Sequence, residues 1–147
     1  MKMKYILQFI LLFSLTAFGQ GHKEKREQVQ ALKVSYFTTE LNLSSDEAAK
    51  FWPVYNAYEE KYFSVRHNKM RGLIKKIDET GIDKLSEKEA DAYLNQFEDA
   101  DAELFSLRKK LVTDLKPILS SVKILKLKKA EDDFNKKLLS KYKGKKK

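Results

Sequence analysis

The 147-residue chain contains no cysteine, two prolines and five glycines. Without cysteine it can form no disulfide and offers neither a thiolate nucleophile nor a thiolate metal ligand. Few helix-breaking residues together with 35% charged residues favour long helices. Beyond the first residues, no stretch approaches the roughly 18 consecutive apolar residues that a membrane-spanning helix requires. We therefore expect a chain that is held together by packing and is not stably inserted in a membrane.

The one long apolar run lies at the amino terminus and predicts a secretory signal peptide. Two lysines precede an almost continuous apolar segment over 5–15, and Ala17-Phe18-Gly19 then supplies the small residues that a signal peptidase reads. We expect residues 1–19 to be removed by cleavage before Gln20. No cysteine follows that point, so a thioether-linked lipid anchor is excluded. The mature chain is expected to be exported, with one helical domain over 20–142.

Positive charge is concentrated at the carboxyl terminus. The whole chain has a net charge of +9, and residues 116–147, with twelve lysines and three acidic residues, carry +9 by themselves. A basic balance points to nucleic acid, anionic lipid or acidic proteins as partners, and export removes most of the case for nucleic acid. Residues 143–147 are expected to form a disordered basic tail, with at most weak attraction to an anionic surface.

Helical spacing of apolar residues and two capping signals predict about four helices. Ser44 with Glu47, and Ser86 with Glu89, match the S-x-x-E capping box, in which each side chain bonds a free backbone N–H at a helix start. The predicted helices cover about 23–40, 45–80, 86–115 and 120–141.

Single residues mark the expected interruptions. Pro53 lies inside the second helix and should kink it, because proline removes one backbone donor and crowds the preceding turn. Gly81 should end that helix, and Pro117 separates the last two helices. At about 1.5 Å per residue the second and third helices would be roughly 50 Å and 40 Å long. A single hairpin of such helices leaves apolar stripes exposed, which favours a homodimer over a compact monomeric bundle.

Three stretches of the sequence resemble a known family: two short segments, and the residues that follow the first of them. Leu43-Ser44-Ser45-Asp46-Glu47 is similar to its LTXXQ motif, and Leu119-Ser120-Ser121-Val122-Lys123 stands where the family carries a second copy, with Lys123 in place of Gln. With Phe51-Trp52-Pro53-Val54-Tyr55-Asn56, they resemble the Spy/CpxP-like periplasmic proteins, in the Bacteroidetes-type branch often labelled sensors of ECF-type sigma factors. The residues that carry the resemblance are Leu43, Ser44, Glu47, Phe51, Trp52, Pro53, Tyr55, Asn56, Leu119 and Ser120.

This resemblance implies an all-helical, cradle-like homodimer of long antiparallel hairpins, soluble in the periplasm. Relatives act as ATP-independent chaperones, as restraints on envelope-stress regulators or as metal-responsive sensors. The first two roles imply unfolded or regulatory envelope proteins, such as a sigma-factor system or a sensor kinase, as partners. A resemblance to a family is better evidence for architecture than for function, so these roles remain alternatives.

Aromatic residues at 4-3-4 spacing in the second helix suggest a binding surface. Phe51, Tyr55, Tyr58 and Tyr62 share one helical face, and basic residues follow them. Rings give large apolar contact at little cost in entropy, which suits the binding of other proteins. The alternative is that these rings pack the core or a dimer contact. The candidate partner-binding residues are Tyr58, Tyr62, Phe63, Arg66, Lys69 and Arg71.

Metal binding and catalysis have little support in the sequence. His22 could complete an amino-terminal Gln20-Gly21-His22 site for Cu(II) or Ni(II), but only after cleavage at that one position, so it is a weak candidate. His67 stands among basic residues without a second His or Cys nearby. No glycine-rich phosphate loop or nucleophile motif is present. We expect no enzyme, no catalytic residue and no cofactor, with a metal-responsive sensor as the alternative to a protein-binding protein.

Overall fold

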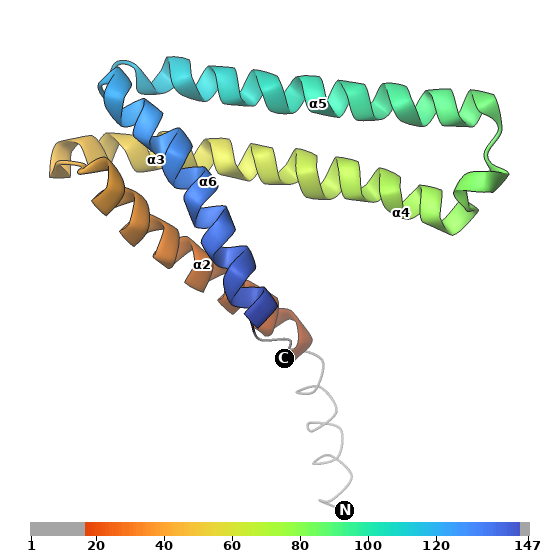
Figure 1. Ribbon diagram of the computed structural model, residues 1–147, viewed down its shortest axis with the longest axis horizontal. Coiled ribbons are helices and arrows are strands. Elements are labelled where there is room, and N and C mark those ends of the chain that lie inside the picture. Colours follow the sequence, from red (N-terminus) through yellow and green to blue (C-terminus); the bar gives the residue numbers. More distant parts are fainter. Residues whose placement is uncertain (1–16, 145–147) are drawn as a thin grey trace, which may run out of the picture. The chain divides into compact units, whose positions relative to one another are not determined.

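The computed structural model describes residues 17–144 (Figure 1). These residues contain helices and no strand, so the predicted all-α class is confirmed. The elements are α2 Ala17–Leu41, α3 Ser45–Phe63, the π-helix η1 Ser64–Met70, α4 Arg71–Thr80, the 3-10 turn η2 Ile82–Lys84, α5 Glu87–Leu115 and α6 Ser121–Gly144. Nearly all of the predicted signal peptide, residues 1–16, lies outside the described residues.

Both predicted capping boxes are present. At the start of α3, the hydroxyl of Ser44 accepts from the Glu47 N–H at 3.2 Å, and the Glu47 carboxylate accepts from the Ser44 N–H at 3.0 Å. Ser86 and Glu89 make the same reciprocal pair at the start of α5. Each box satisfies two backbone donors that the first helical turn would leave unpaired.

The predicted second helix is a continuous helical run with one departure. Pro53 lies within α3, and Gly81 ends α4 with a φ of 86°, a conformation that glycine adopts without steric cost. Between α3 and α4 the backbone widens into the π-helical turn η1, which the spacing of apolar residues in the sequence does not predict. Inward positions follow 4-3 spacing up to Val65, and the next buried residue is Leu73, one position later than two further helical turns would place it. The turn η1 therefore accommodates one extra residue.

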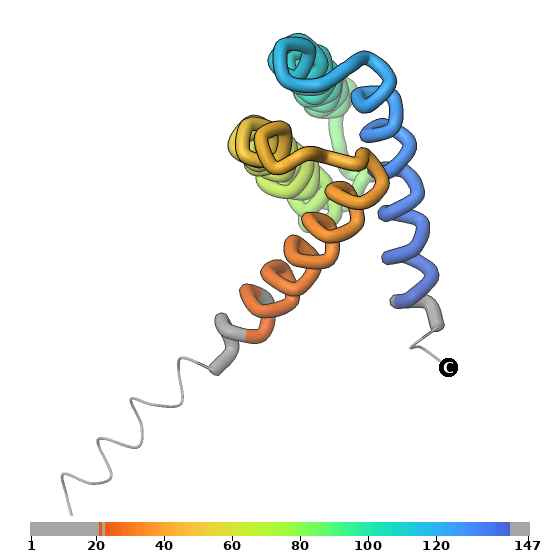
Figure 2. The backbone as a smooth tube through the Cα atoms, turned by 90° about the vertical axis from the view of Figure 1, so that its left-hand side faces the viewer, coloured from red at the N-terminus to blue at the C-terminus, as the bar shows by residue number. Residues whose placement is uncertain are grey.

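Residues Leu43–Lys126 form one compact unit, here called the hairpin unit. In it, α3, η1 and α4 run antiparallel to α5 (Figures 1 and 2). Arg108 donates a hydrogen bond to the Tyr62 hydroxyl, and Lys69 pairs with Glu103, which sets the register of the two arms. The buried side chains of the unit are Phe51, Tyr55, Val65, Leu73, Ala100, Leu104, Leu111, Leu115, Leu119 and Ile124.

The second unit combines residues 17–42 with 127–144 of the described chain. Phe134 on α6 packs edge-on against Phe37 of α2, with ring centroids 5.9 Å apart, and its ring is tilted against that of Tyr36 at a centroid distance of 5.8 Å. Lys137 lies over the Tyr36 ring at 4.4 Å, where its charge faces the electron-rich ring. Leu41 and Leu127 are also buried. Aromatic contacts therefore hold α2 to α6.

The carboxyl-terminal helix is longer than predicted. It begins at Ser121 and continues to Gly144, so two residues assigned to the basic tail are helical, and 145–147 lie outside the described residues. Asp132 pairs with Lys136 at 2.5 Å, one turn away. Between 17 and 144, no helix has both the length and the apolar character needed to cross a membrane.

Candidate functional site

The two copies of the LTXXQ-like motif meet in space. Ser120 Oγ accepts from the Lys123 N–H at 3.3 Å, so Ser120 caps its helix as Ser44 caps α3. Lys123 Nζ then donates to Glu47 Oε2 at 2.5 Å, across 76 residues of sequence. The two side chains are only 24% and 27% exposed. Lys123 therefore neutralises the carboxylate of the first capping box.

The electrostatics of Glu47 follow from these contacts. The hydrogen bond from Lys123, followed by that from the Ser44 backbone, holds the pKa of the Glu47 carboxyl below its usual range. Both partners favour the charged form, so at neutral pH the carboxylate is an acceptor and not a proton donor. This arrangement ties the starts of two helices together.

The remaining motif residues build the same end of the hairpin, here called the base. The Phe51 ring stacks on Tyr55 with centroids 5.2 Å apart and meets Trp52 edge-on at 4.9 Å. Phe51 and Tyr55 are buried, and Trp52 is half-buried. Leu119 is buried and Leu43 half-buried, whereas Pro53 and Asn56 are exposed. The burial of Phe51 and Tyr55 supports the interpretation that these two residues of the aromatic stripe pack the core.

Three of the six candidate binding residues face the other arm of the hairpin. Tyr58 and Tyr62 are half-buried, with ring centroids 5.5 Å apart. The Arg108 guanidinium lies 5.1 Å from the Tyr62 ring centroid, and the hydrogen bond to the Tyr62 hydroxyl raises the pKa of Arg108. Lys69 is held by its ion pair with Glu103. These side chains fix the register between the arms.

The other three candidates lie outward. Phe63, Arg66 and Arg71 are exposed, and the Phe63 ring stacks on His67 with centroids 4.0 Å apart. The six residues predicted as one surface are therefore divided between the hairpin seam and its exterior. Phe63 keeps 40% of its area exposed, which makes it the one large apolar side chain of the six that is open to a partner.

Phe63 belongs to an exposed apolar row that spans both arms. Phe63 and Ile74 each follow an inward residue, Tyr62 and Leu73, and so lie about 100° further round the helix. On α5, Leu94 and Phe105 stand in the same relation to Tyr93 and Leu104. In an antiparallel pair this rotation brings both rows to one side of the hairpin. The resulting set, here called the apolar face, consists of Phe63, Ile74, Leu94 and Phe105, which are 40%, 49%, 60% and 66% exposed.

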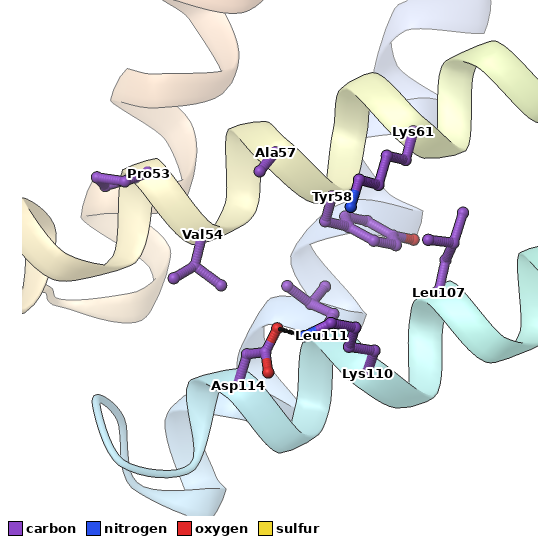
Figure 3. A pocket seen from close by; sticks show the side chains of 9 residues that line it. All are labelled: Pro53, Val54, Ala57, Tyr58, Lys61, Leu107, Lys110, Leu111 and Asp114. Atoms are coloured by element: carbon purple, nitrogen blue, oxygen red, sulfur yellow. Dashed lines mark hydrogen bonds and ion pairs between the residues drawn. The ribbon is translucent and has the colours of Figure 1, made fainter.

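The opposite side of the hairpin is hollowed near the base. Figure 3 shows Val54, Tyr58, Leu107 and Leu111 directed toward a hollow of about 350 Å³. The ion pair between Lys110 and Asp114, 2.6 Å long, lies at its edge. Nearer the tip, a second hollow is lined mainly by polar and charged residues such as Asn68, Lys76 and Asp99. The two sides thus differ, with protruding apolar side chains on one and shallow hollows on the other.

Leu94 and Phe105 were not named as binding candidates from the sequence. Each stands beside another apolar or aromatic residue, and helical spacing alone does not decide which of two neighbours points inward.

Among the residues whose side chains are described, no group of three or more His, Cys, Asp or Glu is gathered as a metal site. The side chain of His22 lies outside that set. Comparison with protein-family models, curated proteins and solved structures finds no match to the chain.

Proposed function

We propose that this chain is an exported, periplasmic protein that binds other proteins without a cofactor, either holding unfolded chains or modulating an envelope-stress regulator. The observation that carries the proposal is the apolar face, where four large side chains remain open on two long helices. A contiguous apolar patch of this kind on a protein surface is often functional. The similarity of Leu43–Glu47 and of the residues after it to Spy/CpxP-like proteins supports the same function.

The interior of the hairpin supports binding over catalysis as the proposed activity. None of the described residues buries a polar or charged side chain, and the two carboxyls of the hairpin unit with shifted pKa values, Glu47 and Glu89, both have lowered ones. A general acid at neutral pH needs the opposite shift. The chemistry offered by this surface is apolar contact flanked by charge.

A holding assay tests the function. The mature chain, residues 20–147, is mixed without ATP with a chemically unfolded test protein that aggregates on dilution. We expect light scattering by the aggregating protein to fall as the chain approaches equimolar amounts. For the regulatory role, the tethered mature chain should retain a defined envelope protein from an extract. Absence of both activities would contradict the proposal.

We also propose that the chain assembles as a homodimer. Each helix of the hairpin buries one face only, and further large apolar side chains such as Val122 and Leu125 stay exposed. A small domain without disulfides gains stability by burying such side chains between subunits. Multi-angle light scattering at micromolar concentration should give about twice the monomer mass, and a stable monomer throughout that range would refute the dimer.

A further inference from the structure

The apolar face has the length and order of side chains of a helix-binding seam. The register set by Tyr62–Arg108 and Lys69–Glu103 places Phe105 between Phe63 and Ile74 along the hairpin, and Leu94 beyond Ile74. The four side chains thus alternate between the two arms over about 20 Å, at 1.5 Å per residue. Half-buried Met70 lies within the same stretch and packs against the buried cluster of Val65, Ala100 and Leu104 beneath it. An α-helix laid along the two arms would meet Phe63 and Phe105 near one of its ends and Ile74 and Leu94 near the other.

The apolar face is narrow and extended. With side-chain areas of roughly 200 Å² each, the exposed parts of the four residues sum to about 400 Å² of apolar area. A single amphipathic helix of four to five turns fits a face of this length, because such a helix contacts its partner through one apolar stripe.

Charge divides the face along its length. Arg66 and Arg71 occupy the turns between Phe63 and Ile74 on one arm, whereas Glu98 and Asp101 occupy the turns between Leu94 and Phe105 on the other. All four charged side chains are exposed, and none of them forms an ion pair or side-chain hydrogen bond within residues 17–144. The seam therefore has a basic edge along η1 and α4 and an acidic edge along α5.

We propose that the apolar face binds an amphipathic helix of a partner protein that has an acidic flank on one side of its apolar stripe and a basic flank on the other. The acidic flank lies along Arg66 and Arg71, and the basic flank lies along Glu98 and Asp101. Charge complementarity of this kind fixes the direction of the bound helix and excludes helices of a single sign. This inference rests on the proposed protein-binding function and names the class of partner.

The probe is a synthetic helix of about 18 residues with leucines at i, i+3, i+4 and i+7 spacing, glutamates on one flank and lysines on the other. Fluorescence anisotropy measures its affinity for the mature chain. We expect binding that weakens about tenfold or more in the double variant Phe63→Ser with Phe105→Ser, because buried apolar anchors dominate such interfaces. Ile82→Ser is the matched control, since Ile82 is an exposed apolar residue at the hairpin tip and outside the face.

A charge exchange tests the flanks separately from the apolar stripe. The mature chain should prefer the split-charge peptide to one with glutamates on both flanks. Replacing Glu98→Lys and Asp101→Lys should reverse that preference, because both edges of the seam are then basic. Circular dichroism should show that all variants keep their helicity, which separates loss of binding from loss of fold.

The outcomes separate this inference from the proposed function. Weaker binding by the double variant, retained binding by Ile82→Ser and a reversed flank preference support the helix-binding seam. If the chain prevents aggregation of the test protein but the double variant binds the peptide as wild type does, the seam is wrong and the protein-binding function stands. If the double variant converts a dimer to a monomer, the face is a contact between copies and the inference is overturned. If the chain neither holds unfolded protein nor retains an envelope protein, the proposed function itself fails.

Discussion

The base of the hairpin and its distal half, which runs from Phe63 through the turn between the arms to Phe105, use similar residues in opposite ways. At the base, the rings of Phe51 and Tyr55 are buried, and the capping-box carboxylate of Glu47 is paired with Lys123. In the distal half, Phe63 and Phe105 remain exposed beside charges that find no partner in the described chain. Aromatic content alone therefore does not define a binding surface. The two halves differ in whether their apolar side chains are buried and their charged side chains are paired within the described chain.

The largest effect should come from truncating a ring at the base. Phe51→Ala removes a fully buried side chain and leaves a cavity, so the free energy of unfolding should fall by about 3–5 kcal/mol. Phe105→Ala, in the distal half, should change it by less than about 0.5 kcal/mol because the ring is mostly exposed. Urea denaturation followed by circular dichroism measures both. Equal losses in the two variants would show that the base and the distal half do not differ in how much their rings stabilise the fold.

Removing a helix cap at the base should have an intermediate effect. Ser44→Ala deprives the Glu47 N–H of its acceptor and should lower the free energy of unfolding by about 1 kcal/mol. Ser45→Ala is the control, because Ser45 is the exposed first residue of α3 and does not cap it. The same denaturation measurement applies. If Ser45→Ala proved as costly as Ser44→Ala, the cap assignment would fail.

In the distal half, one substitution should stabilise the protein. Gly72 lies within α4, and a Cβ added there meets no atom within 4 Å. Gly72→Ala should therefore raise the free energy of unfolding by about 0.5–1 kcal/mol, since glycine in a helix interior loses more backbone entropy than alanine. Gly81→Ala should lower it, because its φ of 86° strains any other residue. Thermal melting that ranks the two variants in the opposite order would contradict this account.

The smallest effect concerns the pH dependence of stability at the base. The pKa of Glu47 is lowered in the folded chain, so its contribution is present above the ordinary value near 4.5 and is lost as pH falls through the lowered value. Glu47→Gln should therefore be less sensitive than wild type to acidification below about pH 4.5. Glu60→Gln, at an exposed position of α3, serves as the control. Identical acid titrations of wild type and Glu47→Gln would show that the Lys123 pair contributes nothing.

The sequence predicts the local features of this fold well. Capping boxes, the helix end at Gly81 and the boundary at Pro117 depend on residues within a few positions of one another, and each is found. The π-turn η1 was not predicted, because the extra residue shows only once Val65 and Leu73 are known to be the buried positions on either side of it. The Glu47–Lys123 pair joins residues 76 positions apart, which no local pattern specifies.

The candidate site was predicted only in part for a related reason. Tyr62 and Phe63 are adjacent aromatic residues, and their spacing allows either to face inward. Contact with Arg108 decides that Tyr62 does, which leaves Phe63 outside. The same choice between Leu104 and Phe105 places the second half of the face on α5. The position of a surface that spans two arms depends on their register, and the register appears only in the folded chain.

Site-specific photo-crosslinking tests most directly whether the apolar face is where another protein binds. A photoreactive amino acid replaces Phe105 in one variant and Ser106 in another; both positions are exposed neighbours on α5, about 100° apart. Each variant is irradiated while it holds the unfolded test protein. We predict a crosslinked product from position 105 and little from position 106. Equal yields at the two positions, or a higher yield at 106, would contradict the assignment of binding to the apolar face.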